Sequence, residues 1–455
     1  MRGEVTKSMN QGNASGQDET MVGETREDAP VVRGNLMESV VEKGNLIAAL
    51  RKVERNGGSP GIDGMTVEQL RDYLREHWPE IKQELLRGTY RPKLVKRVGI
   101  PKPGGGTRCL GIPTALDRFI QQAILQILQG QWDGSFSDHS FGFRPGRSAH
   151  QAIERALSYL RRGWRWVVDI DLEKFFDRVN HDKLMSLVRG RVKDARLLRL
   201  INRYLKSGAM IGEVYRPTGE GTPQGGPLSP LLANLLLDQL DKELERRGHR
   251  FARYADDCNI YVRSKRAGER VMAGVTRFLS QKLRLKVNEL KSAVARPWER
   301  TFLGFTLLYS CKRTVSDKAV KRFKEEVRRQ SRRTRGVSVT TVVAGLRKYL
   351  LGWKAYFGAC ESRSKLKELD SWVRRRLRCY LWKQWGTAGY HELRRRGVSR
   401  DLAWNTAKSA HGPWRLSRSP ALAIALPVRY FAALGLPSLY EKPMGQLTQP
   451  NRRGT

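Results

Sequence analysis

Two adjacent carboxylates, Asp256 and Asp257, stand between apolar runs in the stretch RYADDCNIYVRS, and this arrangement limits the folds open to the chain. Strand alternation places Ile260 and Val262 on one face of the second run and Tyr261 on the other. Aspartate is unfavourable inside a strand but suits a tight turn, so the pair is predicted to lie at the tip of a β-hairpin. For an Asp–Asp pair alone, a solvated turn is the simplest interpretation.

A second apolar run, WVVDID, ends at Asp171. Its alternation places Asp169 and Asp171 on the same face, so strand position alone does not choose between them. Two strand ends that present carboxylates predict a site for a hard cation such as Mg²⁺, which prefers oxygen ligands and commonly binds carboxylates together with substrate phosphates. Two such ions roughly 4 Å apart can activate a hydroxyl and stabilise a leaving pyrophosphate, so the carboxylates predict phosphoryl transfer on a nucleic acid.

The charge of the chain agrees with a nucleic-acid partner. Its 455 residues hold 85 Lys and Arg against 45 Asp and Glu, a net charge of +40, which a polyanion would neutralise. A hydrophobic fraction of 40% and 11 Trp indicate a folded binder of nucleic acid rather than a basic tail. No run reaches the ~20 apolar residues of a membrane helix, and the scattered cysteines predict neither a disulfide framework nor a cysteine-rich zinc site.

The organisation of the chain predicts an α+β domain followed by a helical one. Residues 1–34 are rich in Gly, Asn, Glu and Thr without a period, which predicts a disordered leader. Helical spacing then alternates with a hairpin around a Pro-Gly-Gly-Gly turn and with the two carboxylate strands. Residues 311–400 carry 26 Lys and Arg against 7 Asp and Glu on helical spacing, with Trp and Tyr interleaved.

The run YADD resembles the catalytic signature of reverse transcriptases, and the motifs around it resemble the group II intron-encoded family, also called maturases. These motifs cover about residues 35 to 306, and LLGWKAYFG beyond them resembles the maturase, or thumb, region. The motifs occur in the order of the family: NLMESVVEKGNLIAALRKVERNGGSPGIDGMTVEQL, IPKPGGGTRCLGIPTALDRFIQQAI, SFGFRPGRSAHQAI, DIDLEKFFDRVNHDKL, GTPQGGPLSPLLANLLLDQLD, RYADDCNIYV, LKVNELKS and FLGF.

The resemblance implies the fold of a right-hand polymerase. Fingers and palm are expected at 35–310, an all-helical thumb (maturase, domain X) at 311–395, and a small C-terminal, DNA-binding-like region at 396–455. The implied activity is that of an RNA-directed DNA polymerase that binds its group II intron RNA, assists splicing, and supports retrohoming by copying the intron into DNA. The alternatives are a splicing-only maturase and a reverse transcriptase recruited to host defence.

The resemblance also assigns roles at the metal site. Asp171 rather than Asp169 matches the first metal ligand, because it stands six residues before Asp177 of FFD. Asp256 and Asp257 match the other two carboxylates. The backbone carbonyl of Leu172 is implied as a further ligand of a two-Mg²⁺ site, in which Mn²⁺ can substitute.

The remaining implied roles concern substrates. The residues that match the site of the incoming dNTP are Lys102, Arg108, Phe176 and Gln224, with the Phe176 ring against the sugar where a 2′-hydroxyl would project. FLGF matches the segment that braces the primer end. The arginines expected to face outward on RNA are Arg374, Arg375, Arg376 and Arg378.

The expected partners are the intron RNA, target DNA with a DNA primer, and dNTPs, with no membrane, and with a homodimer as one option. The expected location is the bacterial cytoplasm or nucleoid, with an organelle as the alternative. Longer relatives end in an HNH endonuclease domain with paired CxxC motifs. This chain has no Cys after Cys379, so the compact type that lacks this domain is expected.

Overall fold

The structure is a computed structural model, and it describes residues 35–101, 107–207, 209–211, 214–216 and 225–440. The leader predicted at 1–34 lies outside the described residues. The first nine α-helices are α1 Leu36–Val40, α2 Lys43–Asn56, α3 Leu70–Arg87, α4 Ala115–Trp132, α5 Ala149–Arg161, α6 His181–Arg191, α7 Ala195–Lys206, α8 Ser229–Arg246 and α9 Lys265–Phe278. The later helices are α10 Asp317–Gln330, α11 Val339–Phe357, α12 Arg363–Trp385, α13 Gly389–Arg395, α14 Arg400–Ala407, α15 Pro413–Leu416, α16 Pro420–Ala425 and α17 Val428–Ala433.

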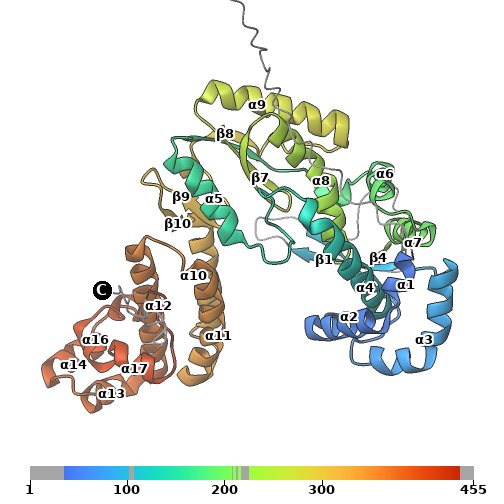
Figure 1. Cartoon of the computed structure of the whole chain (residues 1–455). Helices are drawn as coiled ribbons and strands as arrows, with labels where there is room; N and C mark the ends of the chain where they lie inside the picture. Colours follow the sequence, from blue (N-terminus) through green and yellow to red (C-terminus); the bar gives the residue numbers. More distant parts are fainter. Residues whose placement is uncertain (1–34, 102–106, 208, 212–213, 217–224, 441–455) are drawn as a thin grey trace, which may run out of the picture.

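The strands form small sheets among these helices. They are β1 Val95–Pro101, β2 Thr107–Ile112, β3 Trp166–Ile170, β4 Ala209–Ile211, β5 Val214–Arg216, β6 Arg250–Tyr254, β7 Asp257–Val262, β8 Ala293–Ala295, β9 Phe305–Leu307 and β10 Arg313–Val315. Figure 1 shows helices α1–α3 at one end, α10–α17 at the other, and a sheet between them. The α+β class predicted from the sequence is confirmed, with an all-helical part after β10.

The central sheet has the strand order β6-β7-β3-β8, and β6, β7 and β8 all pair antiparallel to a neighbour. Its two faces are buried in two different cores. Val168 and Ile260 belong to the core formed with α4, α6, α8 and α9, whereas Val167 and Tyr261 belong to the core formed with α5 and the helices after β10. Because both faces are covered, the period of two that strands impose fixes which side chains enter which core.

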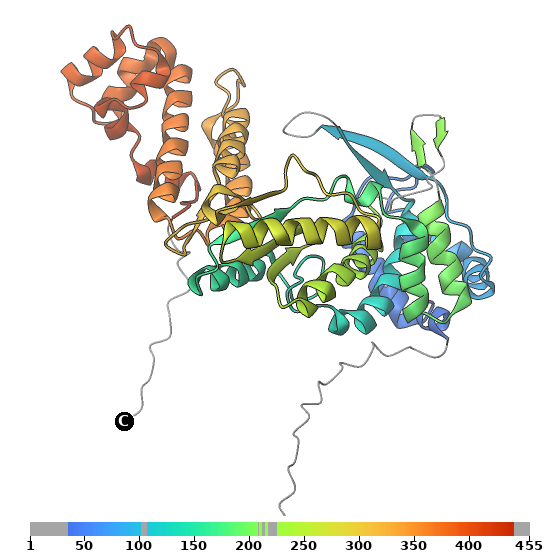
Figure 2. The ribbon, with the colours of Figure 1, turned by 90° about the horizontal axis from the view of Figure 1, so that it is seen from above.

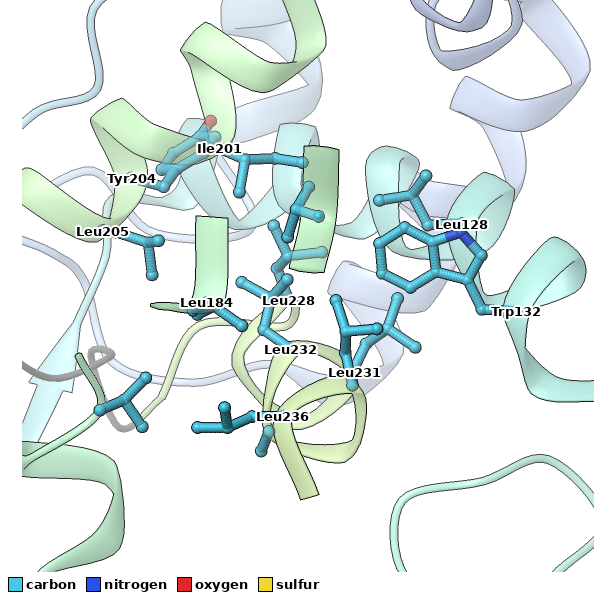
Figure 3. Packing of buried hydrophobic residues seen from close by; sticks show 14 of the residues in the cluster. Leu128, Trp132, Leu184, Ile201, Tyr204, Leu205, Leu228, Leu231, Leu232 and Leu236 are labelled. Carbon is cyan, nitrogen blue, oxygen red and sulfur yellow. The ribbon is translucent and has the colours of Figure 1, made fainter. Parts of the chain in front are cut away.

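Leucines near the start of α8 anchor the first core (Figure 3). Leu228, Leu231 and Leu232 lie among side chains from α4, α6 and α7, and each is 2% exposed. Burial of one such leucine stabilises the fold by roughly 1.5–3 kcal/mol. Their partners in this cluster include Leu128, Trp132, Leu184, Ile201, Tyr204 and Leu205.

The predicted basic hairpin is present as β1 and β2, which pair antiparallel from Lys96↔Ile112 to Pro101↔Thr107. Figure 2 shows these blue strands standing out from the helices of the same end of the molecule. The hairpin continues through β4 and β5 into a sheet of order β2-β1-β4-β5. No helix within the described ranges is long and apolar enough to cross a membrane.

The first two helices after β10 have serine N-caps whose side chains accept a backbone hydrogen bond. Ser316 accepts a hydrogen bond from the backbone N–H of Ala319 at the start of α10, and Ser338 does the same for Thr341 at α11. Residues 396–440 pack into the same core as α11 and α12, through side chains such as Leu422. The thumb and the described part of the C-terminal region therefore share one hydrophobic core.

A buried carboxylate joins α12 to the end of the described chain. Asp370, 3% exposed, accepts hydrogen bonds from Arg374 Nη2 at 3.0 Å, from Ser438 Oγ at 2.8 Å and from the Leu439 backbone N–H at 3.0 Å. Removing one partner of a buried pair leaves an uncompensated charge, which typically costs about 3–5 kcal/mol.

We therefore expect Asp370→Ala to lower the free energy of unfolding by about 3–5 kcal/mol. Circular dichroism during urea unfolding measures this change. The control is Asp317→Ala, since Asp317 pairs with Lys365 while its side chain is 98% exposed, and screened surface pairs contribute little. Equal effects of the two substitutions would contradict the structural role of Asp370.

Candidate metal and catalytic site

The pairing of β3 with β7 brings the predicted carboxylates to one edge of the central sheet. Ile170 pairs with Cys258 in antiparallel register, so the next residues outward, Asp171 and Asp257, follow at facing strand ends. Tyr254 pairs with Asp257 across the β6–β7 hairpin, which leaves Ala255 and Asp256 as its two-residue turn. The hairpin predicted from RYADD is confirmed.

The backbone of Asp171 makes hydrogen bonds, whereas its side-chain Oδ2 makes none. Its N–H donates to Ser292 Oγ at 3.0 Å, and its carbonyl accepts from the Asn288 N–H at 2.8 Å. Its Oδ2 is buried and has no hydrogen-bond donor, although Lys291 Nζ lies 3.4 Å away. A buried carboxylate oxygen without a donor is costly, which is the condition that a bound cation would relieve.

The pKa of Asp257 depends on the neighbouring carboxylates. Burial, followed by the charges of Asp256, Asp169 and Asp171, raises the pKa of Asp257 to about 7. The residue is exposed to solvent at the start of β7, and the negative charges of three neighbouring carboxylates disfavour a further anion there. Carboxylates crowded in this way repel each other unless a cation lies between them.

Asp169, the competing strand carboxylate, already has a partner. Arg300 Nε donates to its Oδ2 at 2.8 Å, and the two form an ion pair at 2.7 Å. In the strand it lies opposite Asn259, two positions inside the sheet from Asp171. The engaged Asp169 and the unsatisfied Asp171 Oδ2 together favour Asp171 as a ligand.

Within the described ranges, no group of three or more His, Cys, Asp and Glu side chains is gathered closely enough to hold a metal ion. The resemblance of the motifs to those of reverse transcriptases nevertheless implies divalent metal ions. The donor set fits such an ion, because Asp171 Oδ2 is unsatisfied and Asp257 is destabilised as an anion. Lys291 Nζ, 3.4 Å from Asp171 Oδ2, forms an ion pair with this oxygen.

Leu172 lies in an isolated antiparallel bridge with Val287. The two hydrogen bonds of this bridge are made by the residues on either side, from Asn288 N–H to Asp171 O and from Glu173 N–H to Lys286 O. The bridge therefore leaves the Leu172 carbonyl uninvolved, as the alternating pattern of an antiparallel ladder requires.

The residues expected to contact the dNTP are described only in part. Lys102 and Gln224 lie outside the described residues, and of Arg108 only the backbone is described, paired with Ile100 in the β1–β2 hairpin. Phe175 is 3% exposed and belongs to the core. Phe176 packs against it at a ring distance of 5.1 Å and is only half-buried.

A cleft of about 510 Å³ extends from Asp257 toward the thumb. Its residues come from the β6–β7 hairpin, from the segment 301–304, from α10 with its N-cap, and from α11: Asp257, Thr301, Leu303, Gly304, Ser316, Lys318, Ala319, Arg322, Phe323, Tyr349, Trp353 and Phe357. Cationic and aromatic side chains beside a carboxylate edge suit a nucleic-acid strand that ends at that edge.

The FLGF motif forms a tight turn in this cleft and not the plain buried strand that it resembles in isolation. Phe302 and Phe305 exchange two backbone hydrogen bonds, and both residues between them have positive φ, +50° at Leu303 and +80° at Gly304. Tyr356 on α11 donates its hydroxyl to the Leu303 carbonyl at 2.8 Å. The thumb thus holds the tip of this turn.

The arginines of α12 are engaged inside the protein. Arg374 is 8% exposed and pairs with Asp370, so the expected outward orientation is wrong for this residue. Arg375 donates to Trp414 O at 3.0 Å, and its guanidinium lies 3.7 Å from the Trp414 ring centroid. Arg376 donates to Ser331 O at 3.0 Å and Arg378 to Leu426 O at 3.1 Å, and both are half-buried. The physical reason is that the C-terminal helices and the segment after α10 pack against this part of α12.

Three contributors to the site were not assigned a role from the sequence. They are Lys291 beside Asp171, Arg300 on Asp169, and the buried Arg253 beneath the β6–β7 turn. Arg253 and Lys291 lie within motifs of the resemblance, RYADDCNIYV and LKVNELKS, but charged residues in strands and loops are usually solvated. Only the tertiary structure identifies their partners.

Comparison with known proteins identifies several relatives of this chain. Protein YkfC of Escherichia coli (strain K12) is 41% identical over 194 residues, which are 42% of this chain and 51% of that protein. The group II intron-encoded protein LtrA of Lactococcus lactis subsp. cremoris is 42% identical over 171 residues, 37% of this chain and 28% of that protein. The chain therefore spans about half or less of the length of these relatives. A solved partial Cas6-RT-Cas1–Cas2 complex matches with a TM-score of 0.36 and 23% identity, over 55% of this chain and 43% of that chain.

Two family models match consecutive parts of the chain. The model of the reverse transcriptase (RNA-dependent DNA polymerase) matches residues 100–307, which include all three carboxylates and the FLGF turn. The model of the group II intron maturase-specific domain matches residues 320–398, which span most of α10 and all of α11, α12 and α13. With these two domains in this order, the chain belongs to the group II intron-encoded reverse transcriptase/maturase family.

Proposed function

We propose that the chain is an RNA-directed DNA polymerase that also binds its group II intron RNA, assists splicing, and supports retrohoming by copying the intron into DNA. One observation supports the polymerase activity: Asp171 and Asp257 lie opposite each other at the ends of paired strands, and Asp171 has a buried oxygen without a hydrogen bond. The intron part rests on the maturase-specific domain and on the likeness to LtrA. The proposed place of action is the cytoplasm.

In this proposal Asp171, Asp256 and Asp257, with the Leu172 carbonyl, hold two Mg²⁺ ions, and Mn²⁺ can replace them. The metal ions supply stabilisation of the attacking and leaving oxygens when bound. The protein itself positions the strands: the incoming dNTP lies near Phe176, and the primer end lies against the turn of Leu303 and Gly304. Lys102, Arg108 and Gln224 are proposed to contact the dNTP on the basis of the family motifs alone.

The structure supports a surface for RNA that differs from the α12 arginines. Arg332, Arg333 and Arg335 follow α10 in the loop to α11, and all three are exposed. We call them the α10–α11 arginine cluster. Arg335 donates from Nη1 to Gln330 O at 2.8 Å, but a guanidinium carries five N–H donors, so an exposed one can still pair with phosphates. We therefore propose this cluster as a principal contact of the thumb with intron RNA.

We expect Asp171→Asn, Asp256→Asn and Asp257→Asn each to reduce DNA-primer extension on an RNA template at least ~10²-fold, because each removes a charge that stabilises the transition state. Extension with labelled dNTPs in Mg²⁺ measures this. Intron RNA binding should remain. The control is Asp169→Asn, which breaks the ion pair with Arg300 and should retain most of the activity.

If Asp171→Asn extends primers normally and Asp169→Asn does not, then Asp169 is the metal ligand in place of Asp171. A wild-type protein that promotes splicing but extends no primer would instead identify a splicing-only maturase.

We expect Phe176→Ala to admit ribonucleotides, because the half-buried ring is proposed to occupy the space of a 2′-hydroxyl. The measurement is primer extension with ribonucleotides alone. Phe175→Ala is the comparison, since the loss of a core ring should reduce stability without changing sugar selection. If Phe176→Ala still excludes ribonucleotides, another residue must block the 2′-hydroxyl.

Replacing the α10–α11 arginine cluster with alanines should weaken intron RNA binding and flatten its salt dependence. The slope of log K against log salt should shrink by about 0.7–0.9 for each phosphate that the protein no longer neutralises. Filter binding across a salt series measures this slope. Arg375→Ala is the comparison, because Arg375 stacks on Trp414 and should chiefly affect thermal stability. If Arg375→Ala flattens the slope and the alanine variant of the α10–α11 arginine cluster does not, then α12 contacts the RNA.

A further inference from the structure

The turn that carries Asp256 has a backbone conformation that needs support. Ala255, the first residue of the two-residue turn, has a φ of +57°, in the left-handed region that side chains with a Cβ rarely adopt. Such a conformation persists only where the surrounding structure holds it, and it recurs at functional sites. The neighbours of Ala255 therefore decide whether the turn keeps this shape.

Arg253, in β6, lies directly beneath this turn and is 1% exposed. Its Nη1 donates to the carbonyl of Ala255 at 2.8 Å. The same side chain makes a fork with Asp241 on α8, from Nε to Oδ1 at 2.7 Å and from Nη2 to Oδ2 at 2.5 Å. Arg253 is therefore a buried cation that is neutralised on one side and fixes a backbone carbonyl on the other.

Two further residues complete the network. Asn234 Oδ1 accepts from Arg253 Nη1 at 3.1 Å, and Ser140 Oγ accepts from Arg253 Nη2 at 2.7 Å. Asn234 Nδ2 in turn donates to the carbonyl of Gly142 at 2.8 Å. All these side chains are almost fully buried, so none of their hydrogen bonds is readily exchanged with bulk water.

Gly142 packs its backbone against the turn at Ala255. A Cβ at this position would collide with the backbone nitrogen of Ala255, so the glycine backbone lies directly against the turn. The segment that contains it runs beside β6, because Phe141 N–H donates to Arg253 O at 2.9 Å. The turn is thus enclosed by α8, by residues 140–142, and by Arg253.

We propose that Arg253 is a positioning residue that fixes the Ala255–Asp257 turn, and with it the direction of both turn carboxylates, through Asp241 and Asn234 on α8. The inference rests on the proposed polymerase function for its catalytic consequence, but not for its structural content. A guanidinium is required, because it binds both oxygens of Asp241 and keeps Nη1 for Ala255. A lysine ammonium at this position keeps the charge but cannot make this planar set of bonds.

The test compares Arg253→Lys with Arg191→Lys. Arg191 is a matched control, since it is 12% exposed in its side chain and pairs with the fully buried Asp238 on the same helix α8. Hydrogen–deuterium exchange of the amides at 255–258 should be roughly tenfold faster in Arg253→Lys and unchanged in Arg191→Lys. Mn²⁺ binding, followed by electron paramagnetic resonance without nucleic acid, should weaken severalfold in Arg253→Lys alone.

Catalysis provides the third readout. The kcat for primer extension should fall ~10- to 100-fold in Arg253→Lys with little change in the KM for primer–template, as expected when reacting groups are misplaced. The exchange and Mn²⁺ measurements still decide the positioning role if the wild-type protein extends no primer. In that case it is the proposed function that fails.

Asn234→Ala is a second variant that tests the same proposal if Arg253→Lys does not fold. It removes an acceptor of Arg253 and the donor to Gly142 while keeping the Arg253–Asp241 pair. It should give the same local increase in exchange and the same loss of Mn²⁺ affinity, to a smaller extent. The inference is overturned if folded Arg253→Lys or Asn234→Ala shows wild-type exchange at 255–258 and wild-type Mn²⁺ affinity, or if Arg191→Lys shows the same changes.

Discussion

The antiparallel pairing of β3 with β7 is the interaction on which the site depends. Its register places Ile170 opposite Cys258, and only in this register do the following residues bring Asp171 and Asp257 to facing positions. A shift by one residue would exchange the two faces of a strand. Such a shift is costly, because Val168 and Ile260 fill one core and Val167 and Tyr261 fill the other. Hydrophobic packing on both faces therefore fixes the position of the carboxylates.

The same sheet couples the carboxylates to the thumb. Its second face shares a core with α11 and α12, and Tyr356 of α11 holds the turn at Leu303 and Gly304 next to the cleft of Asp257. On α12, Arg375 and Arg378 donate hydrogen bonds to the C-terminal region, and Arg376 donates to Ser331 after α10. The thumb thus positions one edge of the cleft, and its exposed arginines include those of the loop after α10 as well as Arg328 on α10 and Arg347 on α11.

The sequence predicts local features well where one period or one turn decides them. The β3 strand, the RYADD hairpin and the basic β1–β2 hairpin are of this kind. It fails for Arg374, because a charge run on a helix indicates a solvated face until the helices that cover it are placed. The same holds for Arg253, whose role depends on Asp241 and on Ser140 far along the chain. The choice of Asp171 over Asp169 needed the family motif, and the ion pair of Asp169 with Arg300 then supplied a physical reason.

The central claim is that these strand ends form a divalent-cation site, and Fe²⁺-directed backbone cleavage tests it most directly. Fe²⁺ that replaces Mg²⁺ reduces added hydrogen peroxide to hydroxide and a hydroxyl radical, and added ascorbate restores Fe²⁺ from Fe³⁺. The radicals cut the chain near the bound ion. The account predicts cuts around Asp171 and around Asp256 and Asp257, suppressed by excess Mg²⁺ and absent in Asp257→Asn. Cuts confined to other segments, or cuts at these positions that persist in Asp257→Asn and in excess Mg²⁺, would contradict it.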